Sequence, residues 1–276
     1  MGGRALSTTK GGIPAQTSYK ATYRTRTYRV RGQAVKARTK PVPGIKHETA
    51  LRETGAELIA GVDEVGLGAW AGPVAVGIVI FRPGSRIYKV RDSKLLDPAR
   101  REVLAQRIRA QSLCWSTGLS WPDEIDRVGL SEAMRRAGAR ALDDLSLWPD
   151  CFLIDGQWNF LKTNPHQPRV KMVVRGDCES ASIASASIVA KVMRDRLMAE
   201  LSPSYPPYLF HLNKGYPSPA HKWALSAFGP CPIHRRLFAP VRRLADEGTE
   251  GRLLPDLSAG IREPALEVSA LQTASV

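Results

Sequence analysis

Apolar runs separated by polar turns divide the middle of the chain into predicted strands. Residues 58–62 are mostly apolar and lead directly into the adjacent acids Asp63 and Glu64, which are followed by a glycine-rich turn. Residues 74–81 are apolar throughout, which is typical of a strand buried on both faces. Residues 112–121 have the pattern of a third strand. The pattern therefore favours a sheet at the centre of the fold.

Two further short strands also end in acids. Residues 151–154 are followed by Asp155 and a glycine, and residues 171–174 are followed by an Arg-Gly-Asp turn that ends at Asp177. Side chains at strand ends in an α/β sheet are well placed to meet at one edge. We therefore expect the acids at three strand ends to converge.

Helical periodicity accounts for the segments between and after these strands. Helices are predicted from about residue 98, over 123–145, over 180–201 and over 219–228. In the third of these, periodicity places one set of residues toward the core and another outside. The core-facing set is Ile188, Val192 and Leu197, and the outer set is Lys191, Arg194 and Arg196.

The charge of the chain narrows the class of partner. The sequence has 40 Lys and Arg against 26 Asp and Glu, a net charge of +14, and such an excess points to a polyanion. Eleven of the basic residues but only one acid lie within residues 1–50.

No apolar run reaches the roughly 18 residues of a membrane span. We expect a monomer without membrane association in the cytoplasm.

The four cysteines are scattered and have no Cys-x-x-Cys spacing, which argues against a zinc ribbon or a disulfide framework. They are expected to be free thiols in a reducing compartment.

Composition also suggests the domain boundaries. Residues 1–52 are rich in Gly, Thr, Arg and Pro without apolar periodicity and are predicted to be a disordered basic arm, which would bind phosphates weakly and without sequence preference. An organellar transit peptide, or a solvated extension with no role, would have a similar composition. Residues 53–247 form the predicted folded domain, and residues 248–276 are expected to be a flexible tail.

The acids Asp63, Glu64, Asp155 and Asp177 are hard oxygen donors, which suit Mg²⁺ or Mn²⁺ rather than Zn²⁺. Two such ions about 3.5–4 Å apart would form a site for in-line displacement at phosphorus. A basic protein with such a cluster is most simply a nuclease.

Structural alternatives remain open for these acids. Asp63 and Glu64 could belong to an ordinary surface turn, and Asp155 and Asp177 could be turn or helix N-cap residues. Asp195, between two arginines of a predicted helix, is expected to be a salt-bridged surface acid.

Several short blocks follow one another in a fixed order between residues 58 and 246. They are Asp63-Glu64-Val65-Gly66, Ala71-Gly72-Pro73-Val74, Asp92-Ser93-Lys94, Ile154-Asp155-Gly156, Gly176-Asp177, residues 186–192 with Arg194-Asp195, Lys214-Gly215-Tyr216-Pro217 and His234-Arg235-Arg236. Together these blocks resemble prokaryotic type 2 ribonuclease H, also called ribonuclease HII.

The resemblance implies a ribonuclease H-like α/β fold, with a five-stranded mixed sheet flanked by helices and a small C-terminal helical part. It also implies hydrolysis of the phosphodiester on the 5′ side of ribonucleotides, both in RNA/DNA hybrids and singly embedded in duplex DNA. Two Mg²⁺ or Mn²⁺ ions would be used, and the products would carry 5′-phosphate and 3′-hydroxyl ends.

The resemblance also assigns roles to residues. The metal ligands would be Asp63, Glu64, Asp155 and Asp177. The backbone of the turn Gly66-Leu67-Gly68 would meet the ribose 2′-hydroxyl, which distinguishes RNA from DNA. Tyr216 would stack on the deoxyribose on the 3′ side. The phosphate contacts would be Lys94, Arg235 and Arg236.

One departure from the family pattern affects the expected activity. The family turn is usually Gly-Arg-Gly, whereas this chain has Leu67 between the glycines. Loss of a charge-assisted phosphate contact is worth roughly 1.5–3 kcal/mol, or about ten- to a hundredfold in binding or rate. We therefore expect retained chemistry with a weaker or shifted junction preference. The alternative that this departure raises is a catalytically weak nucleic-acid-binding protein of the same fold, and a separate alternative is a general cutter of RNA/DNA hybrids.

Overall fold

The computed structural model describes residues 25–30, 33–38, 42–85, 97–161 and 169–247. The chain divides into two units, Met1–Pro41 and Val42–Val276. In the first unit, strand β1 (Thr25–Val30) pairs antiparallel with strand β2 (Gln33–Arg38). The disorder predicted for residues 1–52 therefore does not hold for these two strands.

The described part of the second unit contains one mixed sheet of five strands, in the order β5-β4-β3-β6-β7. The strands are β3 (Ile59–Val65), β4 (Val74–Phe81), β5 (Ser112–Ser120), β6 (Cys151–Asp155) and β7 (Arg169–Val173). β3 pairs antiparallel with β4 and parallel with β6, so it lies at the centre of the sheet. The predicted five-stranded mixed sheet is confirmed.

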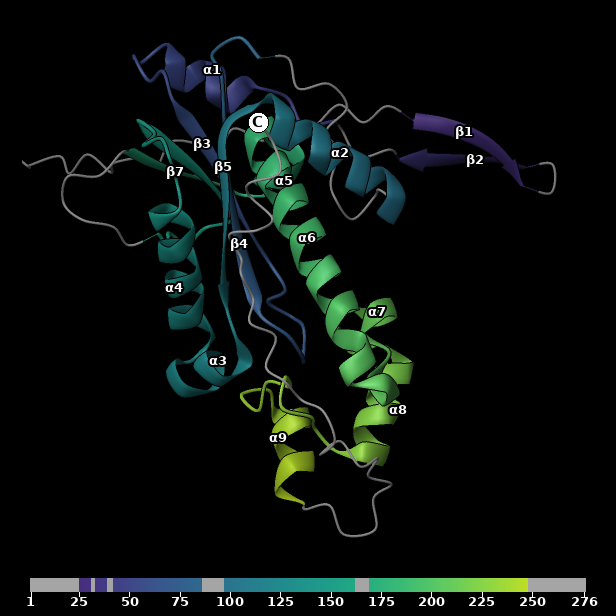
Figure 1. Ribbon diagram of the computed structural model, residues 1–276. Coiled ribbons are helices and arrows are strands. Elements are labelled where there is room, and N and C mark those ends of the chain that lie inside the picture. Colours follow the sequence, from purple (N-terminus) through teal and green to yellow (C-terminus); the bar gives the residue numbers. More distant parts are fainter. Residues whose placement is uncertain (1–24, 31–32, 39–41, 86–96, 162–168, 248–276) are drawn as a thin grey trace, which may run out of the picture. The chain divides into compact units, whose positions relative to one another are not determined.

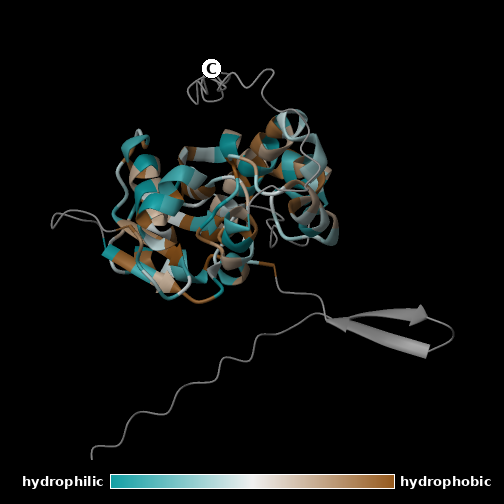
Figure 2. Cartoon of the chain, turned by 90° about the horizontal axis from the view of Figure 1, so that it is seen from below, coloured by the Kyte–Doolittle hydropathy of each residue, from teal (hydrophilic) through white to brown (hydrophobic). Residues whose placement is uncertain are grey.

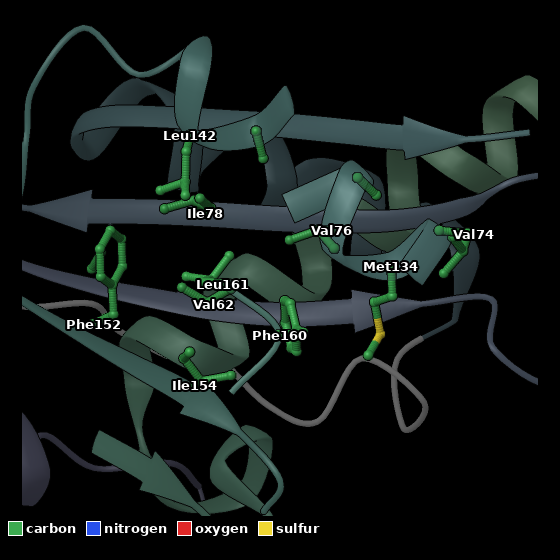
Figure 3. Close-up of a cluster of buried hydrophobic side chains, with 14 of the residues drawn as sticks. Val62, Val74, Val76, Ile78, Met134, Leu142, Phe152, Ile154, Phe160 and Leu161 are labelled. Atoms are coloured by element: carbon green, nitrogen blue, oxygen red, sulfur yellow. The ribbon is translucent and has the colours of Figure 1, made fainter. Parts of the chain in front are cut away.

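Alternation along β3 and β4 sends successive side chains to opposite faces of the sheet. One face carries Val62, Val76 and Ile78, which pack with residues such as Met134 in a buried cluster (Figure 3). The other face of β4 carries Val79, which packs in a second cluster. Because both faces are covered, these strands are apolar at nearly every position.

Helices cover the two faces of the sheet. α4 (Leu130–Asp143) and α6 (Ala181–Leu201) lie on opposite sides of it (Figure 1). α2 (Pro98–Gln111) packs with α6 around Leu104 and Ile108. In the second unit the helical ribbons alternate hydrophilic and hydrophobic positions, as expected for helices with one buried face (Figure 2).

The region predicted as one helix over 123–145 is two helices. α3 (Pro122–Val128) and α4 are separated by Gly129, whose φ of 83° lies in the left-handed region that glycine adopts readily. The apolar period continues across this break, which is why the pattern alone did not reveal it.

The C-terminal part is a set of short helices after α6. They are η2 (Ser202–Ser204), η3 (Pro206–Tyr208), α7 (Phe210–Asn213), α8 (Pro219–Phe228) and α9 (Ala239–Asp246). Their core contains Tyr208 and Phe210, which stack with a ring separation of 5.4 Å. This arrangement matches the predicted small C-terminal helical part.

The folded domain begins earlier than the predicted boundary at residue 53. Its first helix, α1 (Lys46–Arg52), belongs to the unit that starts at Val42. α1 is only two turns long and buries a glutamate, Glu48, so it carries no apolar period that the sequence could reveal. The cysteines Cys114, Cys151, Cys178 and Cys231 are free thiols, as expected.

Candidate metal and nucleic-acid site

Asp63 lies in the second half of β3 and its side chain is almost fully buried, with 5% exposed. The backbone N–H of Glu64 donates to Asp63 Oδ1 at 2.8 Å, and the Ser187 hydroxyl donates a second hydrogen bond. Burial raises the pKa of the Asp63 carboxyl well above its usual range, and the charges of Glu64, Asp155 and Asp177 raise it further. A bound cation would relieve this repulsion.

Strand register brings Asp155 beside Asp63. β6 runs parallel to β3 with Ile154 opposite Val62, so the acid that follows each of these residues stands at the same level. Asp155 Oδ1 accepts a hydrogen bond of 2.6 Å from the backbone N–H of Gly176. The two sequence-distant acids therefore share one edge of the sheet.

Asp177 lies in the first turn of the short helix α5 (Gly176–Glu179) and is 8% exposed. It is not an N-cap residue, because Arg175 occupies that position in α5 and Ser180 occupies it in α6. Its charge acts on the pKa of Asp63. The structure thus places Asp177 near the other acids from a separate element.

The four carboxylates are the type of ligand that binds a hard cation, but in this conformation they are not arranged around a common metal position. Within the described ranges, no group of three or more His, Cys, Asp and Glu side chains could hold a metal ion. The donor set consists of carboxylate oxygens, which suit Mg²⁺ or Mn²⁺. Burial and, after it, the charges of Glu64, Asp155 and Asp177 raise the pKa of Asp63, so the ionised carboxylates would be favoured by a nearby cation. The residues fit such an ion by charge and by donor type.

A cleft of about 480 Å³ opens over the acids and the glycine turn. Its lining residues are Asp63, Glu64, Val65, Gly66, Leu67, Gly68, Asp155, Ser187, Lys191 and Tyr216. Asp177 is not among them. Three of the four predicted metal ligands, the glycine turn and Tyr216 therefore face one cavity. Lys94 lies outside the described residues.

Gly66 is required by close packing behind the turn. Its φ is 92°, and a Cβ added there would come within 2.4 Å of Arg194 Nε. Arg194 is fully buried and donates to the carbonyls of Pro73 (2.8 Å), Ala71 (3.1 Å) and Lys214 (2.9 Å). The prediction that Arg194 faces outward is wrong, because its guanidinium satisfies main-chain carbonyls that would otherwise lack donors.

Arg235, predicted to contact phosphate, is also fully buried. Its guanidinium donates to the carbonyls of Gly72 (2.8 Å), Gly66 (2.7 Å) and Leu67 (3.2 Å). Burial, with a contribution from Arg194, lowers the pKa of Arg235 to about 9. A direct phosphate contact by Arg235 is therefore excluded in this conformation. Its neighbour Arg236 is exposed.

Lys191, predicted to face outward, instead lines the cleft. Its ammonium lies 5.2 Å from the centre of the Tyr216 ring and donates to Asp195 Oδ1 at 2.6 Å. Burial lowers the pKa of Lys191. Asp195 also pairs with Arg101 at 3.1 Å, so it is salt-bridged as expected, but with 16% of its side chain exposed it is largely buried.

Two buried histidines lie behind Tyr216; the sequence marks His234 as part of a family block, but not its burial or its pairing with His221. The N–H of Cys231 donates to His234 Nδ1 (3.0 Å), so His234 Nε2 carries the proton that bonds to His221 Nε2 (2.9 Å). His221 Nδ1 then donates to the Tyr216 carbonyl at 2.8 Å. Burial and the neighbouring His221 lower the pKa of His234 to about 3. Both imidazoles are neutral and fix the backbone of the tyrosine.

Ser187 and Lys191 were also missed as candidate site residues. They are four positions apart in α6, so they lie on the same face of that helix. The signal that the sequence offered for these two residues was their helical spacing of four positions, in a helix that follows closely after Asp177. The pairing of the two histidines had no comparable signal, because a single His at a partly apolar position gives no indication of a partner.

The structure combines a mixed five-stranded sheet, acids at the ends of its strands and a cleft beside a glycine turn. This combination is typical of a hydrolytic nuclease with the ribonuclease H-like fold. The family model described as Ribonuclease HII matches residues 60–241. The chain belongs to the ribonuclease HII family, whose members are ribonucleases that act on nucleic acid and depend on divalent metal ions.

Curated relatives agree with this assignment. Ribonuclease HII of Thermus thermophilus is 45% identical over 184 residues, which cover 67% of this chain and 87% of that protein. Ribonuclease HII of Nitrosococcus oceani is 46% identical over 188 residues, which cover 68% of this chain and 92% of that protein.

Solved structures agree as well. The ribonuclease H2 of Pyrococcus horikoshii OT3 is similar with a TM-score of 0.59 and 26% identity, covering 69% of this chain and 98% of that one. Bst-RNase HIII in complex with Mn²⁺ is similar in fold, with a TM-score of 0.56 and 18% identity over 80% of this chain and 79% of that one. Every helix in the described ranges is too short or too polar to cross a membrane.

Proposed function

We propose that this ribonuclease is an endonuclease that cuts on the 5′ side of ribonucleotides, in RNA/DNA hybrids and where a single ribonucleotide is embedded in duplex DNA. It would leave 5′-phosphate and 3′-hydroxyl ends. The observation that carries the proposal is the convergence of Asp63, Glu64 and Asp155 on the cleft that also contains the Gly66–Gly68 turn. A cutting site and a site that can detect a 2′-hydroxyl thus face the same space.

The proposed ligands of two Mg²⁺ or Mn²⁺ ions are Asp63, Glu64, Asp155 and Asp177. When bound, such ions supply activation of water and stabilisation of the leaving oxygen. The chain itself holds Asp63 through the hydroxyl of Ser187 and orients Asp155 through the N–H of Gly176. These bonds keep the carboxylates directed at the cleft.

The proposed substrate contacts surround the same cleft. Backbone groups of the Gly66–Gly68 turn would meet the ribose 2′-hydroxyl. Tyr216 would stack on the neighbouring sugar, and Lys191 and Arg236 would contact phosphates together with Lys94. Arg235 bonds to carbonyls of the turn from behind, and Arg194 packs behind Gly66 while it bonds to Ala71, Pro73 and Lys214, so neither is proposed to contact the substrate.

Substitution of Asp155 tests the proposal. A duplex with one embedded ribonucleotide should be nicked 5′ to that residue by the wild-type chain in Mn²⁺. Asp155→Asn should lower kcat at least about a hundredfold, because loss of a ligand should cost no less than loss of a residue that only orients one. Asp143→Asn, an exposed acid on α4, is the matched control. Absence of any nick by the wild-type chain would reject the proposal.

One observation favours the alternative of a weakly catalytic binder. The Leu67 side chain packs against the core cluster on one face of the sheet, so the turn offers apolar surface where the family usually has a guanidinium. A binder would retain the duplex and give no difference between wild type and Asp155→Asn in the same assay. A general hybrid cutter would cleave a continuous RNA strand but not a single ribonucleotide.

A further inference from the structure

A segment outside the matched family region is fixed to the turn that carries Asp177. This docked segment, residues 44–48, precedes the family match, which begins at residue 60. Gly44 forms a parallel bridge with Ser180, in which the N–H of Ala181 donates to the Gly44 carbonyl at 2.8 Å. α1 therefore starts at the same end of α6 as α5 (Figure 1).

Glu48 is the centre of this contact. It is 4% exposed, and its Oε1 accepts from the hydroxyl of Ser180 (2.6 Å), the hydroxyl of Ser182 (2.7 Å) and the N–H of Ser182 (3.0 Å). Ser180 is also the N-cap of α6, because its side chain accepts from the N–H of Ile183. The carboxylate thus binds the residues that join α5 to α6.

The residues that bond to Glu48 are linked to two predicted metal ligands, Asp177 and Asp155. α5 contains Asp177, and its first residue, Gly176, donates to Asp155 at 2.6 Å. The Ser180 N–H in turn donates to the Gly176 carbonyl at 2.8 Å. One short path of hydrogen bonds therefore runs from Glu48 through Ser180 and Gly176 to Asp155, with Asp177 inside the same turn.

The local backbone gives a reason why this turn needs support. Arg175, which precedes α5, has φ 57° and ψ 40°, a left-handed conformation that residues other than glycine rarely adopt. Gly61 of β3 approaches α6 so closely that an added Cβ would come within 2.0 Å of the Ser182 carbonyl carbon. A shift of the first turn of α6 would therefore displace backbone at the level of the acids.

We propose that the docked segment positions the Asp177 turn for metal binding, with Glu48 as the positioning residue. The inference rests on the proposed metal set of Asp63, Glu64, Asp155 and Asp177. It adds a part of the chain outside the family match to the machinery that orients two of these acids. Loss of a residue that orients a metal ligand typically costs about 10–100-fold in metal affinity or activity.

The test uses full-length variants and two measurements. Mn²⁺ binding without substrate is followed from the electron paramagnetic resonance signal of the free ion, and nicking of a single-ribonucleotide duplex gives kcat and KM. Glu48→Ala should lower the Mn²⁺ affinity and kcat, each by about 10–100-fold. KM for the duplex should change much less than kcat, because the printed path of hydrogen bonds from Glu48 leads to Asp155 and not to the Gly66–Gly68 turn or Tyr216.

Further variants separate positioning from stability. Glu48→Gln keeps an acceptor oxygen and should restore most of the Mn²⁺ affinity. Ser182→Ala removes one of the three hydrogen bonds to Glu48 and should lower the Mn²⁺ affinity by a smaller factor. If Glu48→Ala does not fold, the Mn²⁺ affinity of Ser182→Ala tests the inference. Glu53→Ala is an exposed charge control. Ser116→Ala removes a buried hydroxyl bond to Ala141 of α4, two strands away from β3 and on the opposite face of the sheet from Asp63.

The outcomes distinguish the inference from the proposed function. Unchanged Mn²⁺ affinity in Glu48→Ala, or in Ser182→Ala where that variant decides, would overturn the inference while leaving the nuclease proposal intact. An equal loss in Ser116→Ala would also overturn it, because the effect would then follow stability alone. A wild-type chain that neither binds Mn²⁺ nor cuts the duplex would reject the proposed function and the inference with it.

Discussion

Leu67 stands between two glycines at the mouth of the cleft and also touches the hydrophobic core. Its side chain therefore contributes to packing where an arginine would place a charge near phosphate. Full burial of a leucine is worth about 1.5–3 kcal/mol, and Leu67 is only partly buried, so its contribution is smaller than that. A leucine at position 67 therefore stabilises the fold through packing, whereas an arginine there would offer a charge for a phosphate contact.

Leu67→Arg should therefore strengthen substrate binding and weaken the fold slightly. We expect KM for a single-ribonucleotide duplex to fall by about tenfold, since one charge-assisted contact is worth roughly 1.5 kcal/mol or more. The melting temperature should fall by a few degrees as the packing is lost. Steady-state kinetics and a thermal melt measure the two effects.

The control is Leu67→Met, which conserves volume and adds no charge. It should leave KM unchanged. The gain from arginine should also shrink as the salt concentration rises, because a phosphate contact is screened. Kinetics of Leu67→Arg equal to those of the wild type would contradict this account of the turn.

Individual acids were predictable from the sequence, whereas the buried arginines were not. Asp63 and Asp155 each follow an apolar strand, so a local pattern marks them. Arg194 and Arg235 are buried because carbonyls from separate parts of the chain, such as Pro73 and Lys214, converge on their guanidinium groups. A one-dimensional pattern assigns any arginine to the surface, since the carbonyls that satisfy it come from elsewhere.

At the scale of elements, two arginines that are adjacent in sequence, Arg235 and Arg236, differ in their contacts, and only Arg235 bonds to the Gly66–Gly68 turn. Arg235 is buried and bonds to three carbonyls around the turn, while Arg236 is exposed and uses its backbone N–H to bond Asp126 at 2.9 Å. Although adjacent in sequence, the two side chains should respond differently to substitution.

Arg235→Ala should destabilise the fold by at least about 2 kcal/mol, because it leaves carbonyls of the turn without donors. For a domain of this size that corresponds to roughly 4–8 °C in melting temperature. Arg236→Ala should leave the melting temperature unchanged and raise KM for the duplex in a salt-dependent way. Thermal melts and kinetics at two salt concentrations compare the pair, and equal melting temperatures would refute the supporting role of Arg235.

Elements with a strong apolar pattern were predicted well, and elements held by polar contacts were not. The run over 74–81 and the helix over 219–228 coincide with β4 and α8. In contrast, α1 was assigned to a disordered arm because its attachment is a carboxylate bonded to hydroxyl groups rather than an apolar stripe. The α3–α4 break likewise depends on the backbone of Gly129, which periodicity does not register.

For the whole molecule, the net charge of +14 favours association with nucleic acid in general, and the cleft is where we propose that the chemistry takes place. Most of the excess charge belongs to residues 1–50, whose role as a nonspecific phosphate-binding arm stays a prediction. The four carboxylates are thus set within a chain whose net charge attracts the polyanion that they would repel.

The stability of the whole domain should depend on pH through the buried histidine pair. His234 has a folded pKa of about 3, whereas an unfolded histidine has a pKa of about 6.5. Between these values the unfolded chain binds a proton that the folded chain excludes. The contribution of His234 to the free energy of unfolding should therefore fall as the pH drops below about 6.5, by up to about 1.4 kcal/mol per pH unit. Asp63, whose pKa is raised by burial, contributes in the opposite sense, because its folded carboxyl binds a proton more readily than the unfolded one.

Urea denaturation at about pH 7 and pH 5 would measure this dependence. The titration of Glu124 does not interfere in this range, because Arg140 lowers its pKa to about 2 and its contribution to stability is lost only below its unfolded pKa. His234→Gln keeps a donor for His221 but does not titrate, so its free energy of unfolding should fall less than that of the wild type between pH 7 and pH 5. His211→Gln, an exposed histidine on α7, should retain the wild-type dependence. Equal pH dependence of His234→Gln and wild type would show that the buried pair does not control acid stability.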